Sequence, residues 1–335
     1  MAEGLLIIGL VIVIALVFDY INGMHDAANA IATVVSTRVL SPRQAILMAA
    51  ILNFGGAFLS TAVANTIGKG IVDPSLVSNG IIIAALLGAI AWNMLTWYFG
   101  IPSSSSHALI GGVIGGAASY HGFGSLNGEG LIKILKALVL SPIVGLIGGF
   151  VIMVAIMWIF RNAKAGLVNR AFKIMQVGSA GFMALSHGSN DAQKIMGVIA
   201  MALFCAGYIS DFHIPFWVIF VCAATIALGT AMGGWRIIKT MGVKMIKLQP
   251  VNGFAAETAA SVVILGATHM GVPVSTTHVI SGSIMGVGSA KRFNAVRWGV
   301  AGNMAVAWIL TIPATALVAW LVGKTLLAIP LDSLH

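Results

Sequence analysis

Apolar stretches about as long as a membrane is thick recur along the whole chain. A helix needs roughly 20 mostly apolar residues to cross the hydrocarbon core of a bilayer. The connections between these stretches are too short to hold a soluble domain. The pattern predicts an all-α integral membrane protein. Its apolar segments are residues 4–36, 44–64, 80–99, 103–119, 131–160, 175–204, 214–234, 254–271, 273–289 and 298–323.

Composition and charge point to the same class. Hydrophobic residues make up 59% of the 335 residues and charged residues only 8%, whereas soluble proteins carry roughly 25% charged residues. The net charge of +9 does not indicate nucleic-acid binding, because the basic residues are confined to a few short loops. Cys205 and Cys222 lie in or beside apolar segments. They predict neither a disulfide nor a metal site, and no cofactor is expected.

Two polar motifs occur twice, in the same order. Residues 101–111 (IPSSSSHALIG) align with 272–282 (VPVSTTHVISG), and residues 23–27 (GMHDA) align with 188–192 (GSNDA). In both cases the second copy follows the first after nearly the same length of chain. Two unrelated motifs at nearly one offset predict an internal repeat. We expect repeat 1 over 1–160 and repeat 2 over 161–335.

The positions of the basic residues predict how each half is oriented in the membrane. Lysine and arginine gather in 38–43, 161–173, 236–247 and 291–297, and they are scarce in 65–79, 120–130 and 205–213. Basic loops face the cytoplasm, which places both termini outside. Equivalent loops of the two halves then lie on opposite faces of the membrane. This predicts an inverted-repeat secondary transporter.

Charged residues at membrane depth are costly and are therefore candidates for function. Asp26 and Asp191 occupy equivalent positions, each beside a glycine, Gly23 or Gly188, where we expect the helix to be broken. Broken helices free backbone groups that bind ions where they line a cavity. Each aspartate could alternatively cap its own half-helix. The charged residues expected at this depth are Asp19, Asp26, Asp191, Lys194 and Glu257.

Hydroxyl clusters follow two prolines. Ser103–Ser106 follow Pro102, and Ser275–Thr277 follow Pro273. Each proline ends one helix, so the hydroxyls gather at the N-terminus of the next, which favours an oxyanion. The clusters could alternatively be ordinary N-caps, but capping a helix needs only one hydroxyl, and each cluster has at least three.

A histidine ends each hydroxyl cluster. His107 and His278 match across the repeats and could either relay protons between the hairpin tips or brace their own helices. The sequence leaves both roles open.

Anion donors beside two carboxylates imply a third component. Two carboxylates would repel an anionic substrate strongly in a low-dielectric site. Co-transported Na⁺ or H⁺ must neutralise them, and this requirement predicts a symporter.

Several motifs resemble the inorganic phosphate transporter (PiT) family. They are Asp26-Ala-Ala-Asn29-Ala, Gly188-Ser-Asn190-Asp191-Ala, Gly253-Phe-Ala-Ala-Glu257-Thr258 and the paired Pro-x-Ser-(Ser/Thr)-(Ser/Thr)-His elements. The resemblance covers nearly the whole chain. It implies inverted repeats with two helical hairpins, and phosphate transport with Na⁺ or H⁺, in some members as a metal–phosphate complex.

The resemblance implies site roles for Asp26, Asn29, Asp191 and the hairpin hydroxyls, and the polar residues at membrane depth extend this set. The expected coupling-cation residues are Asp26, Asn29, Asp191 and Glu257. The expected substrate-binding residues are Asp26, Asn29, Ser104, Ser105, Ser106, Asn190, Asp191, Lys194, Ser275, Thr276 and Thr277.

The chain departs from the family pattern at two places. His25 stands where an asparagine is expected, and Gln193-Lys194 stand where Ala-Asn is expected. Lys194 aligns with Asn29, so its ammonium could contact phosphate or replace one cation. The chain is also short for the family and resembles its bacterial or archaeal members.

The same residues are compatible with functions other than phosphate symport. Sulfate or another tetrahedral oxyanion is the nearest alternative substrate, and a pure cation exchanger is another. A membrane enzyme with a Ser106–His107 or Thr277–His278 pair is disfavoured, because adjacent residues point to different sides of a helix. We expect a multi-pass protein of the plasma membrane that is not an enzyme. The sequence leaves the oligomeric state open, a homo-oligomer included.

Overall fold

The computed structural model describes residues 2–70 and 76–329. Helices joined by short turns make up this part of the chain, and it contains no strand. The first six helices are α1 (Ala2–Ser36), α2 (Pro42–Gly56), α3 (Ala62–Gly70), α4 (Asn79–Phe99), α5 (Ser105–His121) and α6 (Gly128–Ile159). The remaining helices are α7 (Ala165–Cys205), α8 (Phe216–Met232), α9 (Trp235–Lys239), α10 (Pro250–His269), α11 (Thr276–Lys291) and α12 (Trp298–Leu327).

Five of the described helices, α1, α4, α6, α10 and α12, are long and apolar enough to cross a membrane. A sixth span results if α8 and the segment Trp235–Lys244 count as one bent element. The all-α membrane fold expected from the sequence is therefore confirmed. Residues 71–75, in the connection after α3, lie outside the described residues.

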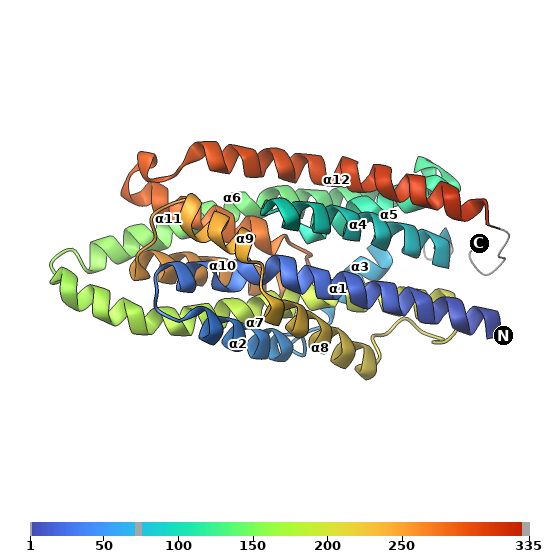
Figure 1. Ribbon diagram of the computed structural model, residues 1–335, viewed down its shortest axis with the longest axis horizontal. Helices are drawn as coiled ribbons and strands as arrows, with labels where there is room; N and C mark the ends of the chain where they lie inside the picture. Colours follow the sequence, from blue (N-terminus) through green and yellow to red (C-terminus); the bar gives the residue numbers. More distant parts are fainter. Residues whose placement is uncertain (1, 71–75, 330–335) are drawn as a thin grey trace.

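The order of elements in α1–α6 recurs in α7–α12. A short 3₁₀ turn precedes the last helix each time, at Phe123–Ser125 and Phe293–Ala295. Pro142 inside α6 and Pro313 inside α12 are related by the same offset as the two proline-serine motifs. Figure 1 shows α1 and α7 running in opposite directions, with the start of α1 and the end of α12 at the same end of the molecule. The two halves thus form inverted repeats; the division after residue 160 stays a prediction and lies between α6 and α7.

The helix breaks are not where the sequence analysis put them. α1 and α7 continue without interruption through Gly23 and Gly188. These glycines serve close packing: a Cβ at Gly23 would clash with the carbonyl oxygen of Ile226 in α8, and one at Gly188 with that of Asn53 in α2.

The interruption instead occurs in the second element of each repeat. Residues 57–61 separate α2 from α3, and residues 233–234 separate α8 from α9. The chain bends by 62° between α8 and the segment beginning at α9. Gly233 has a φ of 69°, a left-handed conformation that suits glycine and ends α8.

Two hairpin helices pack mainly against helices of the opposite repeat. α5 lies against α12, and α11 lies against α6. Gly111 of α5 meets the backbone of Ile312, and Gly282 of α11 meets that of Pro142, so closely that a Cβ would clash at either position. Small residues at such crossings let helices approach within membranes.

The interior has a polar layer between two apolar clusters. One cluster contains the early part of α1, from Ile7 to Phe18. The other contains its later part, from Ala28 to Val34. Asp19, Asn22 and Asp26 lie between these parts of α1 and are buried. The fold therefore encloses its polar side chains near the middle of the helices.

Candidate functional site

Two helices with equivalent motifs bring the predicted polar residues together. Asp26 and Asn29 lie three residues apart on α1, and Asp191 and Lys194 do so on α7. Residues three apart share one helix face. All four residues are at most 3% exposed, so this face of each helix points into the protein.

The tip of α11 lies between the two carboxylates. Thr276 donates a hydrogen bond to Asp191 Oδ2 at 3.0 Å, and Thr277 donates one to Asp26 Oδ1 at 3.4 Å. Asn29 Nδ2 donates to the hydroxyls of Thr276 and Thr277 at 3.3 and 3.0 Å. The N-terminus of α11 therefore connects the two aspartates.

The tip of α5 reaches the same region through a lysine. Lys194 Nζ donates to Ser106 Oγ at 2.6 Å and forms an ion pair with Asp191 Oδ1. Ser106 in turn donates to the carbonyl of Val274, just before α11. Lys194 thus joins α7 to the α5 hairpin and supplies positive charge to one of the two carboxylates.

Two of the predicted substrate-binding serines act as N-caps. Ser104 Oγ accepts a hydrogen bond from the backbone N–H of His107, and Ser275 Oγ accepts one from His278. These bonds satisfy amides that the first turn of a helix leaves free. Of the remaining hydroxyls, those of Ser106, Thr276 and Thr277 contact the lysine or a carboxylate.

The two hairpin histidines contact each other. The ring centroids of His107 and His278 are 4.4 Å apart, and those of His278 and Trp308 are 4.0 Å apart. His107 Nδ1 also lies 2.8 Å from Ser104 Oγ. The contact holds the two hairpin tips against one another, whereas a proton relay through these rings stays a prediction.

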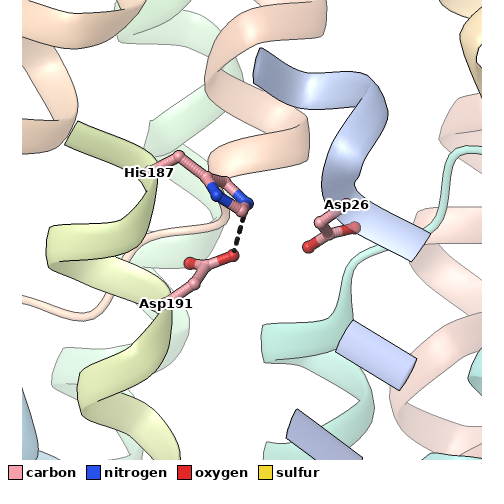
Figure 2. Close-up of side chains that lie close together, drawn as sticks. All are labelled: Asp26, His187 and Asp191. Atoms are coloured by element: carbon pink, nitrogen blue, oxygen red, sulfur yellow. Dashed lines mark ion pairs between the residues drawn. The ribbon is translucent and has the colours of Figure 1, made fainter. Parts of the chain in front are cut away.

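A further histidine approaches each aspartate. His25 Nδ1 lies 2.8 Å from Asp26 Oδ1, and His187 Nε2 lies 3.1 Å from Asp191 Oδ2. Figure 2 shows Asp26 facing His187 and Asp191 across the gap between α1 and α7. One ligand atom from each of these three residues lies within 4.8 Å of the others. Carboxylate and imidazole groups at such distances are suited to a cation.

His187 is a site residue that was not predicted from the sequence. A signal was present, because His187 precedes Asp191 by four residues and would share its helix face. His187 also takes the place of Asn22 when the alignment of residues 23–27 with 188–192 is extended by one position. The spacing alone did not show that the side chain would face Asp26.

Glu257 lies apart from the two aspartates in its hydrogen bonding. Its carboxylate accepts bonds from Thr33 Oγ1 at 2.5 Å, from Gln176 Nε2 at 3.0 Å and from Ser179 Oγ. These donors join α1, α7 and α10. The structure thus places Glu257 in a cluster of its own, next to the central site along α1.

Some polar atoms at the site have no partner among the described residues. They include Ser105 Oγ, Asn29 Oδ1 and Asn190 Oδ1, although Asn190 Nδ2 donates to Thr268 at 2.9 Å. Buried polar groups are rarely left unpaired without a reason. Donors and acceptors therefore remain available beside the N-termini of α5 and α11, where the helix dipole favours an anion.

Two stretches of the chain, residues 22–169 and 161–319, match the model of the phosphate transporter family. The chain belongs to this family. The resemblance inferred from the motifs is therefore confirmed, and the protein is a phosphate transporter of the membrane rather than an enzyme.

Two curated relatives of this phosphate transporter match it over nearly their full lengths. One from Rhizobium meliloti, named "Probable low-affinity inorganic phosphate transporter", is 52% identical over 316 residues, covering 94% of each chain. A relative of the same name from Bacillus subtilis is 52% identical over 310 residues, covering 92% of this chain and 93% of its own. A solved structure titled "The sodium-dependent phosphate transporter" is 25% identical, with a TM-score of 0.87 over 96% of this chain and 99% of that one.

Proposed function

We propose that this phosphate transporter is a symporter, which imports inorganic phosphate together with a cation by alternating access. The observation that carries the proposal is the charge at the site. Among the described residues, Asp26 and Asp191 are buried together with a single ammonium, that of Lys194. With both carboxylates ionised and the rings of His25 and His187 neutral, one negative charge is left without compensation before an anion arrives.

The cost of that charge can be estimated. Two like unit charges 4 Å apart repel by about 4 kcal/mol at an effective dielectric constant of about 20. Phosphate carries one or two negative charges at neutral pH, so each of its charges would be repelled by the uncompensated carboxylate. A cation that enters with phosphate removes the repulsion and makes the binding of each depend on the other.

A divalent metal carried with phosphate is a second candidate for the coupling cation. It is favoured by the cluster of Asp26, His187 and Asp191. Metal–ligand distances of about 2.0–2.2 Å place two ligands of a tetrahedral site roughly 3.4 Å apart, so the three side chains would have to move closer together to hold one metal. A metal held there would be cargo, with phosphate completing its coordination. Na⁺ or H⁺ would satisfy the charge argument equally.

The substrate itself has one close alternative. Hydroxyl donors at two helix N-termini fit any tetrahedral oxyanion, so sulfate stays the alternative substrate for the same site. Competition between the two anions separates these possibilities.

The basic end of the molecule offers an exit route. A cavity of about 790 Å³ is lined in part by Thr37, Lys173 and Gln249. Thr37 donates to Gln176 at 2.9 Å, and Gln176 donates to Glu257. We propose that this hydrogen-bonded cluster closes the path from the central site to the cavity and opens during the cycle.

Uptake of radiolabelled phosphate into proteoliposomes tests the proposal. Na⁺ gradients, pH gradients and divalent metals are supplied separately, and sulfate is added as a competitor. Symport predicts accumulation above equilibrium with one of these cations. Equilibration without accumulation under every gradient would contradict symport.

Two variants connect that assay to the site. Asp26→Asn and Asp191→Asn each remove a carboxylate with little change of shape, and both should lose gradient-driven uptake. Asp211→Asn is the matched control, because Asp211 is an exposed carboxylate in the connection after α7. Normal gradient-driven uptake by either site variant would show that its carboxylate is not a coupling group.

A further inference from the structure

Asp19 is a buried acid that the proposed site leaves unused. Its side chain on α1 is 0% exposed, and neither carboxylate oxygen has a hydrogen-bond partner among the described residues. The Oδ1 of Asn22, one turn further along α1, is also without a partner there. Asp26 and Asp191, in contrast, are each held by a hydroxyl and a histidine.

The described neighbours of Asp19 supply no positive charge. Asp191 of α7 is the charged group that acts on it electrostatically, and the Cys222 thiol of α8 is the nearby titratable group. The third helix packed along α1, α4, contains no Asp, Glu, Lys, Arg or His. Phe18 and Ile226 belong to the surrounding apolar cluster. A bare carboxylate is strongly disfavoured when it is buried in such a place.

The position of Asp19 relates it to the site. It precedes Asp26 by seven residues, two turns of helix, so both share one face of α1. The rise of a helix puts it about 10 Å nearer the N-terminal end of α1. That end is opposite the basic loops, so by the predicted topology Asp19 lies between the external face and the two aspartates.

Asp19 also breaks the symmetry of the repeats. When the alignment of residues 23–27 with 188–192 is extended toward the N-terminus, its equivalent in α7 is Ala184. A group present in one half alone is not part of the paired cradle formed by Asp26 and Asp191. Asp19 is therefore suited to a step that occurs once in each transport cycle.

We infer that Asp19 is a proton carrier of the transport cycle, an inference that rests on the proposed symport. The carboxylate takes a proton from hydronium on the external side and releases water, and the neutral acid persists in the apolar interior. When the site opens to the cytoplasm, the acid returns the proton to water as hydronium. Each cycle therefore moves this proton inward with phosphate, and no other reactant is required.

Comparison of net uptake with exchange tests the inference. In proteoliposomes, Asp19→Asn should lose phosphate uptake driven by a pH gradient, because an amide cannot release a proton. The same variant should retain exchange of labelled for unlabelled phosphate across the membrane, since exchange needs no net proton movement. Asp19→Glu restores an acid and should restore part of the net uptake.

The other results would overturn the inference. Unchanged net uptake and pH dependence in Asp19→Asn would show that the residue carries no proton. If Asp19→Asn remains monodisperse but loses both phosphate exchange and phosphate binding, Asp19 is part of the phosphate site instead. If the variant does not fold, a pH-sensitive dye inside wild-type liposomes still decides: phosphate entry without acidification overturns the inference. Wild-type protein that exchanges phosphate but accumulates none under any gradient would refute symport itself.

Discussion

Ser105 offers the sharpest test of where phosphate binds. It is the first residue of α5, it is 4% exposed, and its hydroxyl has no partner among the described residues. Its equivalent in the other hairpin, Thr276, is already bonded to Asp191 and Asn29. Of the two residues, only Ser105 has a hydroxyl at a helix N-terminus that is free to donate to a ligand. We therefore expect Ser105 to donate a hydrogen bond to a phosphate oxygen.

The size of the effect follows from that bond. A hydrogen bond to a charged group contributes about 1.5–3 kcal/mol. Its loss in Ser105→Ala should weaken phosphate binding about 10- to 150-fold, at roughly 1.4 kcal/mol per factor of ten. Without phosphate the hydroxyl has no partner in the described part of the chain, so the thermal stability of the unliganded protein should stay unchanged.

Ser106→Ala is the matched control. It removes a neighbouring hydroxyl that accepts from Lys194 and donates to the Val274 carbonyl. This variant should lose stability even without phosphate, by about 1.5–3 kcal/mol, because a buried ammonium loses an acceptor. Ser105→Ala should therefore weaken phosphate binding without changing the stability of the unliganded protein, whereas Ser106→Ala should lower that stability.

The assay combines phosphate-dependent uptake with thermal unfolding of the purified protein. The reasoning predicts that Ser105→Ala raises the apparent phosphate constant while the melting temperature without phosphate stays at the wild-type value. An unchanged phosphate constant would show that Ser105 does not bind the anion. A larger change in the cation constant than in the phosphate constant would assign the α5 tip to the cation.

Three further predictions address the lysine, the glycine packing and the topology. Lys194→Met leaves the carboxylate of Asp191 without its ammonium partner and should destabilise the protein by about 3–5 kcal/mol; unfolding at the wild-type temperature would contradict a stabilising pair. Gly188→Ala should lower the free energy of unfolding by about 1–3 kcal/mol through overpacking. Gly178→Ala on the same helix is the control, because a methyl group there has open space and should not lower stability. Equal unfolding temperatures of the two variants would show that α2 can move away from Gly188. Val243→Cys, at an exposed position near the end of the basic segment 236–247, made in a protein whose native cysteines are replaced, should react with an impermeant maleimide only after the cells are permeabilised; labelling of intact cells would reverse the topology.

Much of the architecture follows from patterns local in the sequence. Apolar length predicts the spans, and the proline-serine motifs predict where α5 and α11 begin. The paired motifs predict that Asp26 and Asp191 occupy equivalent places on α1 and α7, as the structure shows. These features need only the chain near each residue, or a comparison of the chain with itself.

The contacts between helices could not be predicted in the same way. A glycine inside an apolar segment is compatible with a break or with a close crossing, and the choice depends on the helix opposite. Gly23 and Gly188 proved to be crossings, and the bends fell in the second element of each repeat. The bond of Lys194 to Ser106 spans 88 residues, and no spacing rule relates such distant positions. The same applies to the approach of His187 toward Asp26.

The packing of α5 on α12 has a consequence for how the protein is made. The glycine face of α5 is covered by Ile312 and Ala316, which are synthesised roughly 200 residues later. At about 5–20 residues per second, α5 must wait some 10–40 s before its partner emerges from the ribosome. During that interval the first half of the chain sits in the bilayer with a crevice that lipid or the insertion machinery must fill. Assembly of the hairpin therefore comes at the end of synthesis, and a chain truncated before α12 would contain every residue of the site without the support that positions it.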